Sequence, residues 1–223
     1  MYFPSDSTFV WKVLYLVAEF LKFFCCRVKV EGAENVPATG GVVLACNHNP
    51  GFDFVMLGYA SPRQVYFMAK KEIFDIHPWL SKLLFAAGTF PILRGKHDQR
   101  AIASAMELVK SGKVLGMFPE GTRSRTGKLQ RAHSGAAHIA MEANAPVVPT
   151  VVIGSEKAFA RKWLPWGRPL VTVRFAPPIV LENPTDDHLS ARQYTNRIMC
   201  AIAELLPPER RGFYADCGTL EEE

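Results

Sequence analysis

The five cysteines of this chain of 223 residues lack the spacing of a metal-binding or redox motif, and no two of them form a CxxC pair. They are Cys25, Cys26, Cys46, Cys200 and Cys217. An odd count argues against a closed set of disulfides, so we expect a reducing, cytosolic environment. No spacing among His77, His97, His133 and His138 suggests a metal site either, so we expect no bound metal.

The N-terminal region lacks the features of a secretory signal, since no basic residue precedes its apolar stretch and no small-residue cleavage site follows it. Residues 8–26 are almost continuously apolar, and as a helix they would reach about 28 Å, close to the thickness of a bilayer core. Lys12, Tyr15, Glu19 and Lys22 recur at helical spacing, and such a polar stripe favours a helix that lies in the membrane interface. A spanning helix and a core-packed helix are the alternatives, and the many aromatic side chains argue against the second.

Basic residues outnumber acidic ones by 26 to 21, which gives a formal net charge of +5. This balance favours anionic partners such as acidic lipid surfaces, phosphate-bearing substrates or nucleic acid. We expect no nucleic-acid partner, because the run 123–131 is basic but no nucleic-acid-reading module is recognisable. The segment 155–169 mixes basic and aromatic residues, a composition that suits lipid head groups or a solvated surface loop.

Apolar periodicity and turn residues predict strands that alternate with helices. The predicted strands are 28–30, 40–47, 65–69, 89–93, 114–118, 147–153 and 170–175. The predicted helices are 8–26, 54–59, 79–87, 98–110, 134–144 and 190–206. This alternation predicts a single layered α/β domain with a mostly parallel or mixed central sheet flanked by helices. We expect an amphipathic membrane-associating helix at 1–27, the domain itself at 28–207 and a C-terminal tail at 208–223.

The segment Asn47 to Asp53, NHNPGFD, follows a predicted buried strand and holds a candidate base. Pro50 and Gly51 favour a turn that returns Asp53 to His48. A carboxylate on one ring nitrogen would hold the histidine in the tautomer that can accept a proton from a hydroxyl. No serine or cysteine nucleophile is placed beside the pair, so direct attack by a substrate hydroxyl is favoured over a covalent acyl-enzyme.

Two other interpretations of this segment remain beside the general-base interpretation. The pair His48 and Asp53 is also compatible with a structural hydrogen bond. Cys46 would offer a thiol nucleophile beside His48, although a cysteine in an apolar strand usually only packs.

A second polar segment, Phe118 to Arg125 with the sequence FPEGTRSR, offers groups that bind anions. Arg94 and Arg123 suit a phosphate, because a guanidinium donates two charge-assisted hydrogen bonds to it. The backbone N–H of Gly121, or of a neighbour, is a candidate donor to a developing oxyanion, unless the residue only shapes a turn. The basic residues that follow, up to Arg131, either add to the positive field or form a solvated loop.

Four blocks in this order resemble the glycerolipid acyltransferases, of the 1-acylglycerol-3-phosphate acyltransferase type. The blocks are NHNPGFD at 47–53, GTFPILRG at 88–95, FPEGTRSR at 118–125 and APVVP at 145–149. Each block alone is weak, whereas the ordered set is specific and covers most of the chain. Two positions depart from the family pattern: Leu93 stands where Asp or Arg is common, and His133, just before Ser134 and Gly135, stands where many members have Lys.

The resemblance implies transfer of a fatty acyl group from an acyl thioester, acyl-CoA or acyl carrier protein, to the free hydroxyl of 1-acylglycerol 3-phosphate. His48 would be the general base and Asp53 the residue that orients it. The acceptor would be held by five residues: Arg94, Glu120, Gly121, Thr122 and Arg123. No cofactor is implied, because the acyl donor is itself a substrate. The protein would work at an anionic membrane surface, on the cytoplasmic face, as a peripheral or monotopic enzyme.

Two alternatives follow from the same residues. The departures at Leu93 and His133 leave another lysolipid acceptor open. A non-catalytic membrane-binding protein with the same fold is a rival of another class, against which the intact pair of His48 and Asp53 argues.

Overall fold

The structure, a computed structural model, describes residues 7–92, 99–158, 168–181 and 190–218. The predicted Arg94 and Leu93, most of the 155–169 segment and the acidic end of the chain lie outside these residues. The helices are α1 (Phe9–Cys25), α2 (Asp53–Ala60), α3 (Lys71–Phe74), α4 (Pro78–Ala86), α5 (Gln99–Lys110), α6 (Gly135–Glu142) and α7 (Ala191–Glu204). The strands are β1 (Arg27–Glu31), β2 (Val42–Cys46), β3 (Val65–Lys70), β4 (Thr89–Ile92), β5 (Val114–Met117), β6 (Val147–Ile153) and β7 (Leu170–Phe175).

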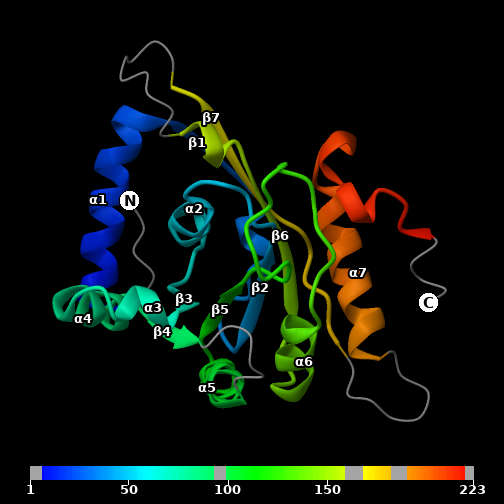
Figure 1. Ribbon diagram of the computed structural model, residues 1–223, viewed down its shortest axis with the longest axis horizontal. Coiled ribbons are helices and arrows are strands. Elements are labelled where there is room, and N and C mark those ends of the chain that lie inside the picture. Colours follow the sequence, from blue (N-terminus) through cyan, green and yellow to red (C-terminus); the bar gives the residue numbers. More distant parts are fainter. Residues whose placement is uncertain (1–6, 93–98, 159–167, 182–189, 219–223) are drawn as a thin grey trace.

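One seven-stranded sheet with the order β1-β7-β6-β2-β5-β3-β4 runs through the molecule (Figure 1). The neighbouring strands are parallel except for β6 and β7, which pair antiparallel. The sheet is therefore mixed and mostly parallel, as the alternation of strands and helices predicted. β2 lies in the middle with β5 on one side and β6 on the other, so the loops after β2 and β5 emerge side by side.

The central strands are buried on both faces, which explains their unbroken apolar runs. All five residues of β2 are buried. Val43 and Ala45 join the hydrophobic cluster on one face of the sheet, whereas Val42, Leu44 and Cys46 join the cluster on the other. Successive side chains of a strand point to opposite faces, so one short strand anchors both layers.

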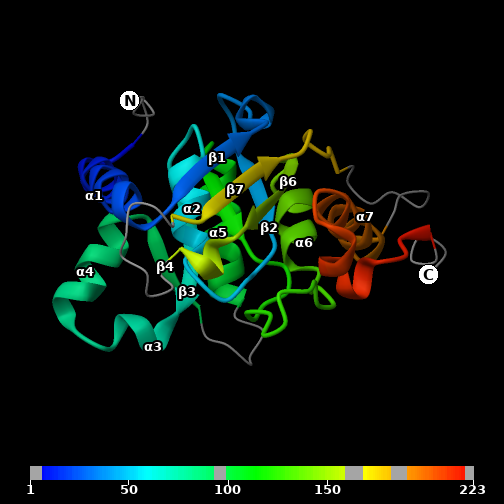
Figure 2. The ribbon, with the colours of Figure 1, turned by 90° about the horizontal axis from the view of Figure 1, so that it is seen from above.

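Helices cover the two faces of the sheet unequally (Figures 1 and 2). The helices α5, α6 and α7 supply the buried residues of the first cluster, and α7 adds the largest share with side chains such as Ile198, Met199 and Ile202. Helix α2 packs on the second face through Met56 and Leu57.

Helix α1 binds the rest of the molecule through its polar stripe. Thr8 caps the helix, since its hydroxyl accepts a hydrogen bond from the N–H of Trp11 at 3.2 Å. Tyr59 of α2 donates its hydroxyl proton to Glu19 at 2.5 Å and accepts a hydrogen bond from Lys22 at 2.7 Å. The ring of Tyr15 stacks on that of Tyr59 at 5.1 Å.

The outward face of α1 is consequently apolar. Its exposed large side chains are Phe9, Val13, Leu16, Val17, Phe20, Phe23 and Phe24. Helix α4 touches α1 and buries none of its own residues, and the segment around it exposes Ile73, Ile76, Trp79, Leu83 and Phe85. We call these twelve side chains the α1–α4 apolar face. Within the described residues, no helix is long and apolar enough to cross a bilayer.

The predicted elements all have counterparts within a few residues of their expected ends, and the short helix α3 was not predicted. The part of the C-terminal segment that the structure describes packs against the domain: Tyr214 is 1% exposed and its hydroxyl accepts a hydrogen bond from the N–H of Ala132 at 3.0 Å. The proposed division of the chain at residues 27 and 207 stays a prediction.

Two of the five cysteines form a disulfide, Cys200 with Cys217, with their Cα atoms 5.8 Å apart. The other three, Cys25, Cys26 and Cys46, are free. A reducing environment would favour free thiols, and this pair departs from that expectation. The 3₁₀ turns after α7 bring Cys217 back to the helix, a return that cysteine spacing alone does not reveal.

This disulfide gives a thiol count that can be measured. Denatured without reductant, the protein should expose three thiols to Ellman's reagent, and Cys217→Ala should expose four. Closing a loop of 17 residues is worth about 3 kcal/mol in the chain-entropy treatment, so reduction should lower the free energy of unfolding by about that amount. Five reactive thiols in the unreduced wild type would contradict the pairing.

Candidate active site

His48 and Asp53, the predicted pair, lie in hydrogen-bond contact at the carboxyl end of β2. The distance from His48 Nδ1 to Asp53 Oδ2 is 2.6 Å. Asp53 is fully buried and the His48 side chain is 12% exposed. Because a carboxylate only accepts hydrogen bonds, Nδ1 carries the proton and Nε2 presents its lone pair.

The turn between the two residues depends on Gly51. Its φ is +140°, and a Cβ there would lie 2.9 Å from the carbonyl oxygen of Ser155. The turn leads directly into α2, whose first residue is Asp53. The second carboxylate oxygen of Asp53 accepts the N–H of Phe54 at 2.8 Å, and the positive end of the helix dipole favours a negative charge at this position.

Two asparagines beside the histidine fix this loop to the neighbouring strand. Asn47 Oδ1 accepts the N–H of Val152 on β6 at 2.8 Å, and Asn47 Nδ2 donates to the Val152 carbonyl at 3.2 Å. Asn49 Nδ2 donates to the same carbonyl at 3.0 Å. Sequence reasoning missed both roles, because the two asparagines flank the histidine but nothing in the sequence names their partner.

Glu120 joins the loop after β5 to the loop after β2. Its Oε1 accepts the backbone N–H of His48 at 2.7 Å, and its Oε2 accepts the N–H of Gln130 at 2.9 Å. A third link runs the other way, since the N–H of Ser124 donates to the His48 carbonyl at 2.7 Å. Burial raises the pKa of Glu120, and the hydrogen bonds from His48 and Gln130 offset part of that effect.

The ring of His48 is supported from the side by an aromatic residue of the second segment. Its centroid is 4.1 Å from that of Phe118, with the rings 21° from parallel. Phe118 in turn stacks on Phe67 of β3 at 6.4 Å. The histidine is therefore held by its backbone N–H, its carbonyl, its Nδ1 and one ring face, and among the described residues Nε2 has no hydrogen-bond partner.

The remaining predicted site residues are placed less directly. Thr122 and Arg123 are exposed in the loop after β5, and Arg94 lies outside the described residues. The N–H of Gly121 donates to the Phe118 carbonyl at 2.9 Å in a turn with φ of +69°. Gly121 thus shapes a turn, and the role of its N–H, or of a neighbour's, as a donor to an oxyanion stays a prediction.

Cys46 does not extend the site. It is fully buried in β2, and burial raises the pKa of its thiol well above the usual value. A neutral thiol packed in the sheet has neither the charge nor the access of a nucleophile.

A family model and the similar known proteins all indicate an acyltransferase. Residues 27–153 match the model of the Acyltransferase family. The 1-acyl-sn-glycerol-3-phosphate acyltransferase of Bacillus subtilis is 39% identical over 129 residues, 57% of this chain and 63% of that protein. The protein of the same name from Saccharomyces cerevisiae is 34% identical over 167 residues, 73% of this chain and 54% of that protein. The matches therefore span less than two thirds of these relatives' length.

A solved structure shares the fold. The 1-acyl-sn-glycerophosphate (LPA) acyltransferase of Thermotoga maritima superposes with a TM-score of 0.67 at 22% identity, over 87% of this chain and 79% of that one. The family match covers more than half of the chain and includes the loops that hold His48, Asp53 and Glu120. This chain therefore belongs to the Acyltransferase family.

Proposed function

We propose that this chain transfers a fatty acyl group from acyl-CoA or acyl carrier protein to the free hydroxyl of 1-acylglycerol 3-phosphate, and so forms phosphatidate. The observation that carries the proposal is the contact of 2.6 Å between His48 and Asp53, in a loop that a second family block holds in place. The names of the relatives supply the substrate.

In the proposed reaction the acceptor hydroxyl gives its proton to His48 Nε2 while its oxygen attacks the thioester carbonyl. The hydrogen bond to Asp53 keeps the proton on Nδ1 and stabilises the imidazolium that forms. The tetrahedral intermediate then expels the thiolate as its C–S bond breaks, and His48 returns the proton to the sulfur. The donor enters as a substrate, so the scheme requires no separate cofactor.

Glu120 acts in this scheme as a positioning residue for the base. Both of its oxygens are occupied by backbone N–H groups, one of which belongs to His48 itself. The expectation that it contacts the acceptor stays a prediction, and these contacts favour the positioning role. Arg123, which is exposed in the same loop, keeps its proposed role toward the acceptor phosphate, together with Arg94.

We further propose that the α1–α4 apolar face rests on the membrane surface. Twelve large apolar side chains from two touching helical segments are exposed there. Such a group of exposed apolar side chains is typical of a surface that contacts lipid. The polar stripe of α1 is turned inward to α2, so the membrane would contact α1 on its opposite side.

The proposed reaction is tested by turnover of 1-acylglycerol 3-phosphate and a long-chain acyl-CoA in mixed micelles, with phosphatidate followed by mass spectrometry. A positioned base is worth about 10²–10⁴-fold, so His48→Ala should lose at least that factor, and Asp53→Asn should lose a comparable one. Product from other lysolipids alone would move the assignment to another acceptor. Lipid binding without turnover for any acceptor or donor would favour the non-catalytic protein.

Glu120→Gln tests the positioning role through stability as well as rate. The amide leaves one of the two N–H groups without its acceptor, which should cost about 1–3 kcal/mol of unfolding free energy and lower kcat. Because the folded pKa of Glu120 is raised, its contribution to stability is fully present below the unfolded pKa and is lost as pH rises through the folded value.

The measurement is urea unfolding of wild type and Glu120→Gln at a series of pH values from about 4 to 7. The stability difference between the two proteins should shrink as pH rises. Glu107→Gln, an exposed change on α5, is the control and should show a pH-independent difference. A difference for Glu120→Gln that grows with pH would contradict the assigned shift.

Membrane binding is tested by flotation with vesicles of phosphatidylcholine and phosphatidylglycerol. Phe20→Glu and Phe23→Glu each remove an exposed aromatic side chain whose burial is worth about 1.5–3 kcal/mol, so each should weaken binding by about 10-fold or more. Val180→Glu, at an exposed apolar residue away from these helices, is the matched control. Equal flotation of all three variants and the wild type would remove this face as the contact surface.

A further inference from the structure

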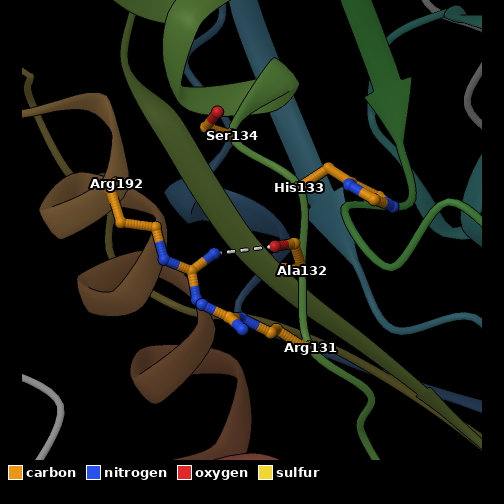
Figure 3. Close-up of a pocket in the computed structure, with 5 residues that line it drawn as sticks. All are labelled: Arg131, Ala132, His133, Ser134 and Arg192. Carbon is orange, nitrogen blue, oxygen red and sulfur yellow. Dashed lines mark hydrogen bonds between the residues drawn. The ribbon is translucent and has the colours of Figure 1, made fainter.

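A pocket of about 380 Å³ lies beside the candidate active site, on the side of the sheet that α6 and α7 cover. It is lined by Arg131, Ala132, His133, Ser134 and Arg192 (Figure 3). The first four residues connect the loop after β5 to α6, and Arg192 belongs to the first turn of α7. No step of the proposed reaction uses this pocket.

Its lining is strongly basic. It contains two arginines and no carboxylate, and the side chains of Arg131 and Arg192 point toward one another in Figure 3. Within the part of the chain that the structure describes, neither arginine forms an ion pair. Two guanidinium groups directed into one pocket repel each other, and an anion between them removes that cost.

Among the described residues, each arginine makes contacts that leave guanidinium donors without a partner. Arg192 Nη1 donates to the Ala132 carbonyl at 2.8 Å, which uses one of the five N–H bonds of its guanidinium. The guanidinium of Arg131 lies 5.9 Å from the ring centroid of Phe213, a contact that uses none of them. A fixed guanidinium with free donors is suited to an oxyanion.

The backbone adds to the positive field of the pocket. Ser134, one of the lining residues, occupies the N-cap position of α6, and its hydroxyl makes no capping hydrogen bond. The positive end of the α6 dipole therefore borders the lining. Burial raises the pKa of the nearby Tyr214, and the charges of Arg192 and Arg131 oppose that effect, so both act on this region.

The pocket shares its backbone with the loops that hold the base. Gln130, the residue before Arg131, donates its N–H to Glu120, whose other oxygen holds His48. The N–H of His133 donates to the Pro119 carbonyl at 2.9 Å, and its ring lies against Gly121, on the side opposite Arg192. A ligand in the pocket is thus one short segment away from the reacting groups.

We propose that this pocket binds a phosphate group of a substrate, through Arg131 and Arg192. The inference rests on the proposed function, because both the CoA donor and the lysophospholipid acceptor carry phosphate. Arg123 and Arg94 are the residues expected to hold the acceptor, so the phosphates of the CoA moiety are the expected occupant. In this proposal Arg131 binds phosphate and is not merely part of a solvated basic loop.

The test compares the double variant Arg131→Gln and Arg192→Gln with the wild type in direct binding. Calorimetry with free CoA and with inorganic phosphate should show affinities that fall by about 10- to 100-fold, the loss expected for charge-assisted hydrogen bonds. Arg131→Gln alone, which breaks no backbone hydrogen bond, should show a smaller loss with unchanged thermal stability. Arg197→Gln is the matched control, because it removes the same charge from an exposed position on the same helix.

Kinetics then identify the source of the phosphate. A raised KM for acyl-CoA, with kcat within about twofold of the wild type, assigns the pocket to the donor. A raised KM for 1-acylglycerol 3-phosphate assigns it to the acceptor. In either case KM should rise by the same factor by which the binding affinity falls. CoA and phosphate affinities that equal those of the wild type in the double variant overturn the proposal. Absence of turnover in the wild type would refute the proposed function alone, since the binding measurements decide the pocket independently.

Discussion

The site depends on one buried carboxylate that joins two loops. Glu120 receives the N–H groups of His48 and Gln130, and it joins the loops after β2 and β5 together with the hydrogen bond from Ser124 to His48 and the stacking of Phe118 on the histidine ring. Burying a carboxylate is costly, and its paired hydrogen bonds offset most of that cost only while both loops keep their positions. Because β2 and β5 are adjacent parallel strands, the loops begin at the same edge of the sheet and the bridge can be short.

Much of this arrangement could be predicted from sequence where the signal is local. The unbroken apolar run of β2 indicated a buried strand, and the proline and glycine after His48 indicated the turn that returns Asp53. Contacts between distant segments could not be predicted in this way. The family resemblance assigned Glu120 to the acceptor and did not reveal it as a bridge between loops, because its partners are backbone N–H groups, which every residue but proline carries.

Helix α1 shows that a helical periodicity alone does not determine which side of a helix packs on the protein. The stripe of Tyr15, Glu19 and Lys22 was recognised, and a polar stripe ordinarily faces water. Here it meets a tyrosine of α2 that satisfies its hydrogen bonds, so the apolar side faces outward. The molecule thus presents an apolar face on α1 and α4 and a basic pocket beside α6 and α7.

The pairing of β1 with β7 has a consequence for how the chain is made. In the part of the chain that the structure describes, the strand at residues 27–31 pairs only with residues 170–175, so this edge of the sheet cannot form until most of the chain has left the ribosome. At a synthesis rate of about 5–20 residues per second, that delay is on the order of ten seconds. During this delay the apolar helix α1 has emerged from the ribosome, whereas strand β7 has not yet been made. A newborn chain of this kind gains from reaching a lipid surface, or a chaperone, before its fold is complete.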